Sequence, residues 1–458
     1  MTPNYSRIAV LDIGKTNAKV VVLDSATGAE VAVARTANKV LKDGLYPHYD
    51  IDKLWSFTLD ALRSFAREPG FDAISITTHG ASAALLDRAG NLAMPVLDYE
   101  HEYSVDIRDA YARLRPPFDE TFSPHQTMGL NVGAQLHYQK TAFPDDFAKV
   151  ATIVTYPQYW TARLTGIASN EVTSLGCHTD LWNPRDDRYS SLVDTLGVRD
   201  LMAPIRSAFD PLGSVLPDIA EAIGLTRKIP VYCGIHDSNA SLLPHLIDRT
   251  EPFAVVSTGT WVINFGVGGD LDHLDPKRDT LANVDAYGRA VPSSRFMGGR
   301  EFETISGEIG HVDRQEVASA IEQVIVKGLM LLPNVVPGSG PFPGKSARWV
   351  NGQGATGAER YAALCLYLAL MNQACLDLIG AQGPIIVEGP FALNDSYLTV
   401  LAALTNRDVI AIAGSTGTSQ GAALLTGIKP PKGGERHIAP STIPELSAYR
   451  QAWHAAMA

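Results

Sequence analysis

Short apolar runs separated by polar or glycine-containing turns open the chain. Ile8 to Leu11 and Ala18 to Leu23 each predict a strand, and the polar turn DIGKTN lies between them. Glu30 to Thr36 predicts a third strand. Apolar residues at helical spacing follow from Asp52 to Arg67, and Phe71 to Thr77 then predicts a short buried strand. Because strands alternate with a helix after the initial hairpin, this pattern predicts an α/β fold with a mixed sheet.

A second strand–turn–strand pattern occurs far downstream. Phe253 to Val256 and Trp261 to Val267 are apolar, and the turn STGT lies between them. Both turns place a small polar or acidic residue two positions before a glycine, which is Gly14 in the first turn and Gly259 in the second. Gly-Thr turns between strands are common, so coincidence is one explanation. A duplicated domain is the other, and it predicts two halves that open with similar hairpins.

Further elements follow the second hairpin. Helices are expected over residues 313–327, 356–378, 393–404, 419–425 and 445–456, and strands over residues 385–387 and 408–412. The stretch from Ala362 to Ala381 is long enough to span a membrane, but Asn372, Gln373 and Asp377 interrupt it. It is therefore interpreted as a buried core helix. The boundary between the halves is expected near residues 248–252, which gives domains of residues 1–248 and 249–458.

Composition narrows the function classes. The chain has 458 residues, of which 45% are hydrophobic and 19% charged, as in folded proteins of two or three domains. A net charge of −11 argues against a broad nucleic-acid or anionic-membrane surface. The four cysteines form no CxxC pair, which excludes a zinc ribbon or a thioredoxin motif. The N-terminus MTPNYSRIAVLDIG has no recognisable signal peptide, so a cytoplasmic location is expected.

The DIGKTN turn has the residues of an anion site. A turn glycine lets backbone N–H groups approach an anion closely, and hydroxyl, amide and ammonium groups add donors and charge. The candidate phosphate contacts here are Gly14, Lys15, Thr16, Asn17 and Lys19. Asp12 at the strand end could hold a hydrated Mg²⁺, which prefers carboxylate oxygens and retained waters. An ordinary hairpin capped by Asp12 explains this segment equally well.

Three later segments carry further candidate chemistry. In GIHDSN, Asp237 follows a strand end beside His236 and could act as a general base, although a helix N-cap is the simpler explanation for it in isolation. STGTW is a second turn rich in hydroxyls and glycine. VEGPFALND could carry a nucleotide base, or it is a plain turn between a strand and a helix.

In this order along the chain, the segments resemble the FGGY carbohydrate kinases of the actin, sugar kinase and heat-shock ATPase superfamily. The resemblance covers roughly residues 7 to 427. It implies two ribonuclease H-like domains with mixed sheets flanked by helices and an interdomain cleft. It also implies Asp237 as the catalytic base, Mg²⁺ near Asp12 and Asp237, and ATP gripped by both glycine–threonine turns. The implied ATP contacts in the second half are Thr258, Gly259, Thr260, Gly389, Pro390 and Asn394.

Three departures from the family pattern lie in the segments that are implied to bind ATP. Glu388-Gly389-Pro390 stands where a GGG-type adenosine turn is usual. Lys15 replaces a threonine or another small residue, and Lys19 stands where an arginine is frequent. The Lys19 position keeps its charge but loses the bidentate geometry of a guanidinium.

The resemblance also implies a sugar site in the first half. TTHGASAALLD, PVLDYEH and TYPQYWTARLTG stand where the family has its sugar-contacting segments, and Gln158 replaces the usual acid in the last of these. A buried, satisfied histidine is the usual explanation for a residue such as His79, and the family context favours a ligand instead. The implied sugar contacts are His79, Gly80, Asp98, Glu100, Gln158, His236 and Asp237.

The expected function is ATP-dependent phosphorylation of a ketose or deoxy-ketose. Within the family, the kinases that act on L-rhamnulose or L-fuculose resemble the chain most. The alternatives are a kinase for another sugar or polyol, of the xylulose or glycerol type, and a catalytically silent sugar and nucleotide binder. The expected cofactors are ATP and Mg²⁺, and the expected partners are small molecules. Neither nucleic acid nor a membrane is expected as a partner, and a homodimer is left open.

Overall fold

The computed structural model describes residues 5–412, 417–429 and 434–457. The chain divides into two compact units, and the first break falls between Asp248 and Arg249. Residues 282–290 and the segment that carries helix α15 (Thr418–Leu424) also belong to unit 1, and unit 2 contains the remaining described residues after 248. The expected pair of continuous domains, 1–248 and 249–458, is corrected for these two segments. The reason for α15 is that it packs against elements of unit 1.

Unit 1 is built around a seven-stranded mixed sheet. Its strands are β1 (Arg7–Ile13), β2 (Asn17–Asp24), β3 (Glu30–Ala37), β6 (Ala73–Thr78), β12 (Pro211–Ser214), β13 (Pro230–Tyr232) and β14 (Ile235–His236). The order is β12-β13-β6-β1-β2-β3, and β14 also pairs with β6. Strands β1, β2 and β3 are antiparallel neighbours, whereas β6 runs parallel to β1, β13 and β14. The early hairpin and the buried strand after it therefore form one mixed sheet, as the apolar pattern predicts.

Helices and small sheets complete unit 1. The helices are α1 (Ile51–Arg67), α2 (Val105–Leu114), α3 (Phe118–Thr121), α4 (Val132–Ala142), α5 (Pro144–Phe147), α6 (Tyr156–Thr165), α7 (Val172–Leu175), α8 (Ser191–Thr195), η1 (Arg199–Leu201), α9 (Pro217–Ile223) and α10 (Asp237–Asp248). The short strands are β4 (Val40–Leu41), β5 (His48–Tyr49), β7 (Ala83–Leu86), β8 (Leu92–Met94), β9 (Thr152–Thr155), β10 (Trp182–Asn183) and β11 (Arg188–Tyr189). In α1, Leu54, Leu62 and Phe65 are buried at helical spacing, which is the face that the sequence pattern predicts.

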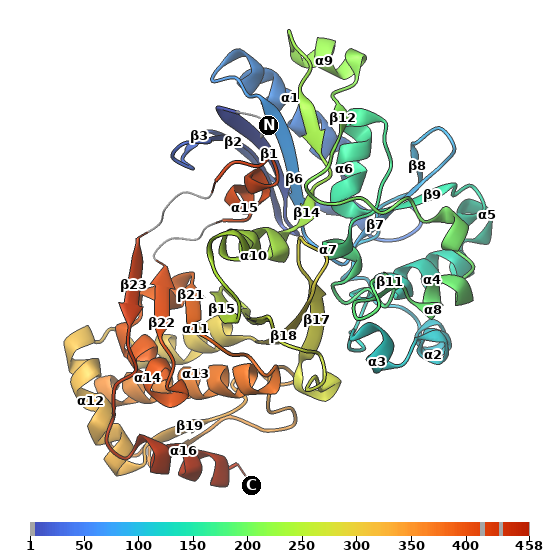
Figure 1. The fold of residues 1–458 in the computed structure, drawn as a ribbon. Coiled ribbons are helices and arrows are strands. Elements are labelled where there is room, and N and C mark those ends of the chain that lie inside the picture. Colours follow the sequence, from blue (N-terminus) through green and yellow to red (C-terminus); the bar gives the residue numbers. More distant parts are fainter. Residues whose placement is uncertain (1–4, 413–416, 430–433, 458) are drawn as a thin grey trace. The chain divides into compact units, whose positions relative to one another are not determined.

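Helix α15 packs into unit 1 although about 400 residues separate it from β1 (Figure 1). Ser75 of β6 donates a hydrogen bond to the Ala422 carbonyl of α15 at 2.7 Å. A Cβ atom on Gly421 would lie 1.7 Å from the Ala240 carbonyl oxygen of α10. Only glycine allows this approach, so the residue type fixes how closely the two helices pack.

A second seven-stranded sheet lies in unit 2, except for residues 282–284 and Ala290, which are in the segment assigned to unit 1. Its strands are β15 (Phe253–Thr258), β16 (Val262–Val267), β17 (Thr280–Val284), β18 (Ala290–Phe296), β21 (Ile385–Glu388), β22 (Val409–Ile412) and β23 (Glu435–Ile438), in the order β17-β18-β16-β15-β21-β22-β23. Along β18-β16-β15-β21-β22 the pairings are antiparallel, antiparallel, parallel and parallel. The series β3-β2-β1-β6-β13 of unit 1 has the same directions. This repeat agrees with the duplication that the two hairpins predict.

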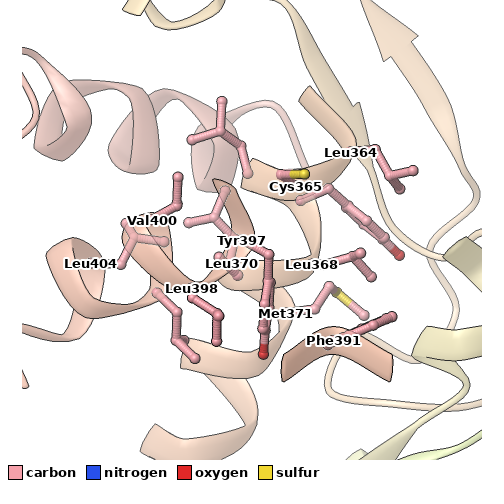
Figure 2. Close-up of a cluster of buried hydrophobic side chains, with 14 of the residues drawn as sticks. Leu364, Cys365, Leu368, Leu370, Met371, Phe391, Tyr397, Leu398, Val400 and Leu404 are labelled. Atoms are coloured by element: carbon pink, nitrogen blue, oxygen red, sulfur yellow. The ribbon is translucent and has the colours of Figure 1, made fainter. Parts of the chain in front are cut away.

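A long apolar helix forms the centre of unit 2. The helices are α11 (Gly298–Ile309), α12 (Arg314–Lys327), α13 (Gly357–Leu378), α14 (Asp395–Thr405) and α16 (Leu446–Ala455), with η2 (Pro276–Arg278), η3 (Pro390–Leu393) and the strand pair β19 (Met330–Leu332) and β20 (Arg348–Val350). By length and hydropathy α13 could cross a membrane, but 78% of its most apolar window is buried inside the protein. Its side chains pack with those of α14 and η3 in the core shown in Figure 2. The helix is therefore part of a core, as its polar interruptions predict.

Candidate active site

Three neighbouring strands of unit 1 end at the same place. Strand β6 pairs in parallel with β1 on one side and with β14 on the other, so that Thr78 is in register with both Ile13 and His236. The next residue of β6 is His79, and the residue after His236 is Asp237. Because adjacent strands lie about 4.8 Å apart, this register gathers Asp12, His79 and Asp237 at one edge of the sheet. Sequence motifs identified all three, and the parallel pairing explains why they meet.

Asp237 is the first residue of α10, directly after β14, and one of its carboxylate oxygens is held by the protein. Its Oδ1 accepts hydrogen bonds from the backbone N–H of Ser238 at 2.6 Å and from the Ser238 hydroxyl at 3.3 Å. Burial, followed by the nearby negative charge of Asp12, raises the pKa of Asp237 to about 6. The side chain still keeps 31% of its surface exposed. It can therefore reach a ligand while being a stronger base than an ordinary aspartate.

The His236 ring contacts the same oxygen of Asp237. Its Nε2 lies 3.2 Å from Asp237 Oδ1, and its Nδ1 lies 3.4 Å from the Asn239 amide nitrogen, which assigns the ring proton to Nε2. Burial lowers the pKa of His236 to about 4, so the ring is neutral near pH 7. A Cβ atom on Gly80 would lie 2.5 Å from His236 Nε2. The buried His236 ring is thus corrected from a sugar contact to a residue that positions Asp237, whereas the sugar contact at the partly exposed Gly80 stays a prediction.

Asp12 connects the first turn to α15. Its Oδ2 accepts hydrogen bonds from the hydroxyls of Thr418 at 2.5 Å and Ser419 at 2.6 Å, and Lys19 Nζ lies 3.5 Å from the same oxygen. Sequence reasoning missed Thr418 and Ser419. The signal was the Gly/Thr/Ser-rich stretch that begins α15, part of which lies outside the described residues.

A hydrated Mg²⁺ fits these carboxylates better than a tightly ligated metal does. Among the described residues, no group of three or more His, Cys, Asp or Glu side chains could hold a metal ion. Asp12 and Asp237 are close enough for the charge of one to raise the pKa of the other. A cation that relieves this repulsion through one or two carboxylates and retained waters matches the preference of Mg²⁺.

Lys15 points to the residues expected on the sugar side. Its ammonium forms an ion pair with Asp98 Oδ1 and lies 3.5 Å from Glu100 Oε2. It also lies over the rings of Tyr99 and Tyr49, 4.8 and 5.1 Å from their centroids. The structure therefore joins a residue expected to bind phosphate to two residues expected to bind sugar.

His79 lies beside this group and packs against three tyrosine rings. Its ring centroid is 5.1 Å from that of Tyr49, 5.6 Å from Tyr99 and 5.0 Å from Tyr156. Its Nδ1 lies 2.8 Å from the Gly80 carbonyl oxygen and donates to it, so Nε2 carries the lone pair. That Nε2 is buried without a hydrogen-bond partner among the described residues. Burial lowers the pKa of His79 to about 4, which leaves a neutral acceptor suited to a ligand hydroxyl.

The tip of the first turn is exposed, and hydrogen bonds from Asn38 fix its backbone. The side chains of Thr16 and Asn17 are exposed, and Gly14 N–H bonds the Asn17 carbonyl oxygen at 2.9 Å. Asn38 donates its side-chain amide to the Gly14 carbonyl oxygen at 2.8 Å and its backbone N–H to the Thr16 carbonyl oxygen at 2.9 Å. Asn38 follows β3 as an ordinary turn residue, and no sequence pattern singles it out.

Gln158 does not fit its expected role as a sugar contact. The side chain is fully buried, and its amide donates to the Cys233 and Gly234 carbonyl oxygens, both at 3.0 Å. Its carbonyl accepts from the Thr155 hydroxyl at 2.5 Å. Gln158 therefore holds the turn between β13 and β14, which leads to Asp237. Gly234 in that turn has a φ of +93°, a conformation that favours glycine.

A buried carboxyl that sequence reasoning missed lies behind His236. Glu171 is fully buried and accepts hydrogen bonds from the backbone N–H of Thr173 at 3.0 Å and from the Thr173 hydroxyl. The Thr173 hydroxyl in turn accepts a hydrogen bond from the backbone N–H of His236 at 3.0 Å. Burial raises the pKa of Glu171 to about 7. The chain of bonds ties the end of β14 to a group that titrates near neutral pH.

The candidate nucleotide residues after 248 belong to unit 2. Thr258 is buried, donates its hydroxyl to the Glu388 carbonyl oxygen at 2.5 Å and accepts from Phe391 N–H at 3.1 Å, so it braces the second turn against the segment of Gly389 and Pro390. A Cβ atom on Gly389 would lie 2.1 Å from the Thr258 carbonyl oxygen.

Gly259 and Thr260 are exposed at the tip of the second turn. Asn394 is the N-cap of α14, where its side-chain oxygen accepts from Tyr397 N–H at 3.1 Å. Thr258 and Asn394 are thus used by the protein itself. This leaves Gly259, Thr260 and Pro390, which is also exposed, as the open part of the expected ATP site in unit 2.

Comparisons with known proteins match both halves of the chain. A model of the N-terminal domain of the FGGY family of carbohydrate kinases matches residues 7–244, and a model of the carbohydrate kinase FGGY C-terminal domain matches residues 250–435. The L-fuculokinase of Salmonella typhi is 27% identical over 273 residues, which are 58% of this chain and 57% of that protein. The rhamnulokinase of Halalkalibacterium halodurans is 22% identical over 267 residues, which are 56% of this chain and 55% of that protein. The matched region thus spans about half the length of these curated relatives.

Solved structures match over nearly the whole chain, and one of them shares more than a third of its sequence. The crystal structure of a carbohydrate kinase from Novosphingobium aromaticivorans has 37% sequence identity and a TM-score of 0.90, and the match covers 98% of this chain and 100% of that one. The resemblance found in the motifs is confirmed together with the mixed α/β fold. The chain belongs to the FGGY family of carbohydrate kinases.

Proposed function

We propose that the protein transfers the γ-phosphoryl group of ATP to a hydroxyl of a deoxy-ketose such as L-rhamnulose or L-fuculose. The observation that carries this proposal is the state of Asp237. The donors on this carboxylate, the Ser238 N–H and hydroxyl and the nearby His236 Nε2, all converge on Oδ1. Oδ2 remains to accept a proton. A raised pKa and a fixed orientation are what a general base needs.

The chemical step asks little covalent work of the protein. As the sugar oxygen attacks the γ-phosphorus, Asp237 Oδ2 takes the hydroxyl proton, the bond to the β-phosphate oxygen breaks and ADP leaves. The exposed Thr16 and Asn17 side chains of the first turn offer donors to phosphate oxygens, and Lys19 offers positive charge. Mg²⁺, held through Asp12 and Asp237, would neutralise phosphate charge when bound. Gly259 and Thr260 supply a second exposed turn.

The choice of a deoxy-ketose rests on the relatives and on the aromatic surroundings of His79. Among the curated relatives are L-fuculokinases and a rhamnulokinase. The rings of Tyr49, Tyr99 and Tyr156 surround the unpartnered His79 Nε2. A sugar that has both hydroxyls and an apolar methyl group suits tyrosine rings that lie beside a neutral nitrogen acceptor.

The first prediction tests both the class and the substrate. The purified protein is incubated with Mg²⁺, ATP and a panel of ketoses, deoxy-ketoses, aldoses and polyols, including xylulose and glycerol, and ADP release is measured. We expect sugar-dependent turnover that is fastest with a deoxy-ketose. We expect Asp237→Asn to lower kcat by about 10² to 10⁴-fold, the usual share of general-base catalysis.

The outcomes separate the alternatives. Activity of Asp237→Asn near that of the wild type, in a protein with an unchanged circular dichroism spectrum, would remove Asp237 from the role. Fastest turnover with xylulose or glycerol would replace the deoxy-ketose but keep the kinase. No sugar-stimulated turnover across the panel, together with measurable sugar or ADP binding, would favour the catalytically silent binder.

A further inference from the structure

The ammonium of Lys15 is already engaged by groups of unit 1. It pairs with Asp98 Oδ1, lies 3.5 Å from Glu100 Oε2, and covers the rings of Tyr49 and Tyr99. A lysine ammonium has three donor hydrogens, and two carboxylates with two ring faces account for its charge and its donors. Only 16% of the Lys15 side-chain surface is exposed.

If Lys15 moved to a phosphate, the buried carboxylate of Asp98 would lose its compensating charge, at a large cost in free energy. The Asp98 side chain is only 8% exposed, and a carboxylate buried to this degree needs a compensating charge. Glu100 shares the ammonium, but its side chain is 58% exposed and can be solvated by water. Asp98 is therefore the partner that holds Lys15 in place.

The two oxygens of Asp98 are in different situations. Oδ1 receives Lys15, the Glu100 backbone N–H at 3.2 Å and the Tyr49 hydroxyl at 3.5 Å. No described residue donates to Oδ2. The carboxylate is thereby fixed through one oxygen, while the other keeps its capacity to accept hydrogen bonds. Asp237 has the same asymmetry, since its donors converge on its own Oδ1.

Asp98 and His79 share a neighbour, because the Tyr49 hydroxyl lies 3.5 Å from Asp98 Oδ1 and the Tyr49 ring packs against His79. The tyrosines that Lys15 covers are two of the three rings around His79. The charges of Lys15 and Asp237 both act on the pKa of His79, in opposite directions, so all three groups are neighbours in unit 1. A ligand hydroxyl near His79 Nε2 thus has a second acceptor close by.

We propose that Lys15 is a positioning residue of the sugar site and not a ligand of the ATP phosphates. Its ammonium holds Asp98 through Oδ1, so that Asp98 Oδ2 accepts a hydroxyl of the acceptor sugar. This rests on the proposed sugar kinase function and deepens it. It also reassigns Lys15 from the phosphate role that the DIGKTN motif implies.

Lys19 provides a matched control in the same hairpin. It is in register with Asp12 on β2, and its Nζ lies 3.5 Å from Asp12 Oδ2 and 3.5 Å from Glu30 Oε1. Its side chain is 26% exposed. The two lysines therefore differ in which acid they accompany: Asp98 for Lys15 and Asp12 for Lys19. Removing the Lys15 ammonium should weaken binding of the sugar, and removing the Lys19 ammonium should weaken binding of the nucleotide.

The experiment compares Lys15→Met, Lys15→Arg and Lys19→Met with the wild type. KM is measured for ATP and for the best sugar of the panel, and the Kd for Mg-ADP is measured by calorimetry. For Lys15→Met we expect KM for the sugar to rise about tenfold or more, as for loss of a charge-assisted hydrogen bond, and the nucleotide constants to stay within about twofold. Lys19→Met should show the reverse split. Lys15→Arg, which keeps the charge, should recover part of the sugar affinity.

Three results would overturn the proposal. The first is a Lys15→Met protein with weakened Mg-ADP binding and an unchanged KM for the sugar, and the second is one with neither changed. The third is an equal loss of sugar and nucleotide affinity that Lys15→Arg does not recover, which indicates a structural role. If no sugar supports turnover, the proposed function fails separately. The Mg-ADP constants of the two methionine variants then still decide whether Lys15 is a phosphate ligand.

Discussion

A single carboxylate sets the expected pH dependence. The pKa of Asp237 is raised to about 6, mainly by burial and further by Asp12. A general base works only when deprotonated, so kcat/KM for the sugar should be level above that pKa and fall about tenfold per pH unit below it. His79 and His236 have pKa values of about 4 and stay neutral over this range. Initial rates between pH 5 and pH 8.5 check the profile. Glu171 also titrates in this range, because its pKa is raised to about 7, so Glu171→Gln is the control that removes its contribution.

The raised pKa of Asp237 should also appear in the pH dependence of the protein's thermal stability. The folded-state pKa lies above the ordinary value of 3.8, so the folded protein holds this proton more tightly than the unfolded chain does. The resulting stabilisation is complete below about pH 4 and is lost as the pH rises through about 6. Asp237→Asn cannot ionise, and it should melt at a higher temperature than the wild type at pH 8, with a smaller difference at pH 5. A Tm difference that does not change with pH would contradict a raised pKa at this residue.

Several site residues could be read from their motifs, and others could not. Asp12, His79 and Asp237 follow strands whose apolar pattern is visible in the sequence, and parallel pairing brings such strand ends together. Gln158 was misassigned because its local segment does not reveal that its amide reaches Cys233 and Gly234, about 75 residues away. Non-local partners of this kind decide whether a polar side chain faces a ligand or the core.

At the scale of elements, the packing of α15 on α10 gives a sharp test. Gly421 has the Ala240 carbonyl oxygen where a Cβ would be, 1.7 Å away, and this backbone atom can move only if the helices separate. Gly307 in α11 has nothing within 4 Å of its Cβ position. We expect Gly421→Ala to lower Tm markedly, and Gly307→Ala to be neutral or stabilising by up to about 1 kcal/mol because alanine is the better helix former.

The same substitution should reach the chemistry through Asp12. Thr418 and Ser419, which donate to Asp12 Oδ2, lie in the first turn of α15 and move with that helix. Gly421→Ala should therefore lower kcat/KM even at temperatures where the protein is fully folded, whereas Gly307→Ala should not. Thermal melts and steady-state rates on both variants check this. Equal behaviour of the two variants would mean that the close helix contact is unimportant.

Elements with a strong apolar period were predictable, and short or distant ones were not. The helix predicted from Asp52 to Arg67 is observed over Ile51–Arg67 because its buried face repeats at helical spacing. Strand β14 has only two residues, Ile235–His236, which is too short for a period to appear. The assignment of α15 to unit 1 depends on contacts across about 400 residues, which no local pattern encodes.

At the scale of the whole molecule, each unit has its own apolar core. Trp160 is fully buried in a cluster made only of unit 1 residues, and Trp453 is fully buried in a cluster made only of unit 2 residues. Separate cores favour separate cooperative transitions, so calorimetry should resolve two unfolding steps. Truncating a buried tryptophan to alanine costs about 3–5 kcal/mol, and Trp160→Ala should lower one step while Trp453→Ala lowers the other. Because Asp12, His79, Asp98 and Asp237 all belong to unit 1, the step lowered by Trp160→Ala is the one that the acceptor sugar should raise. A single transition that both substitutions shift equally would show that the two cores unfold as one.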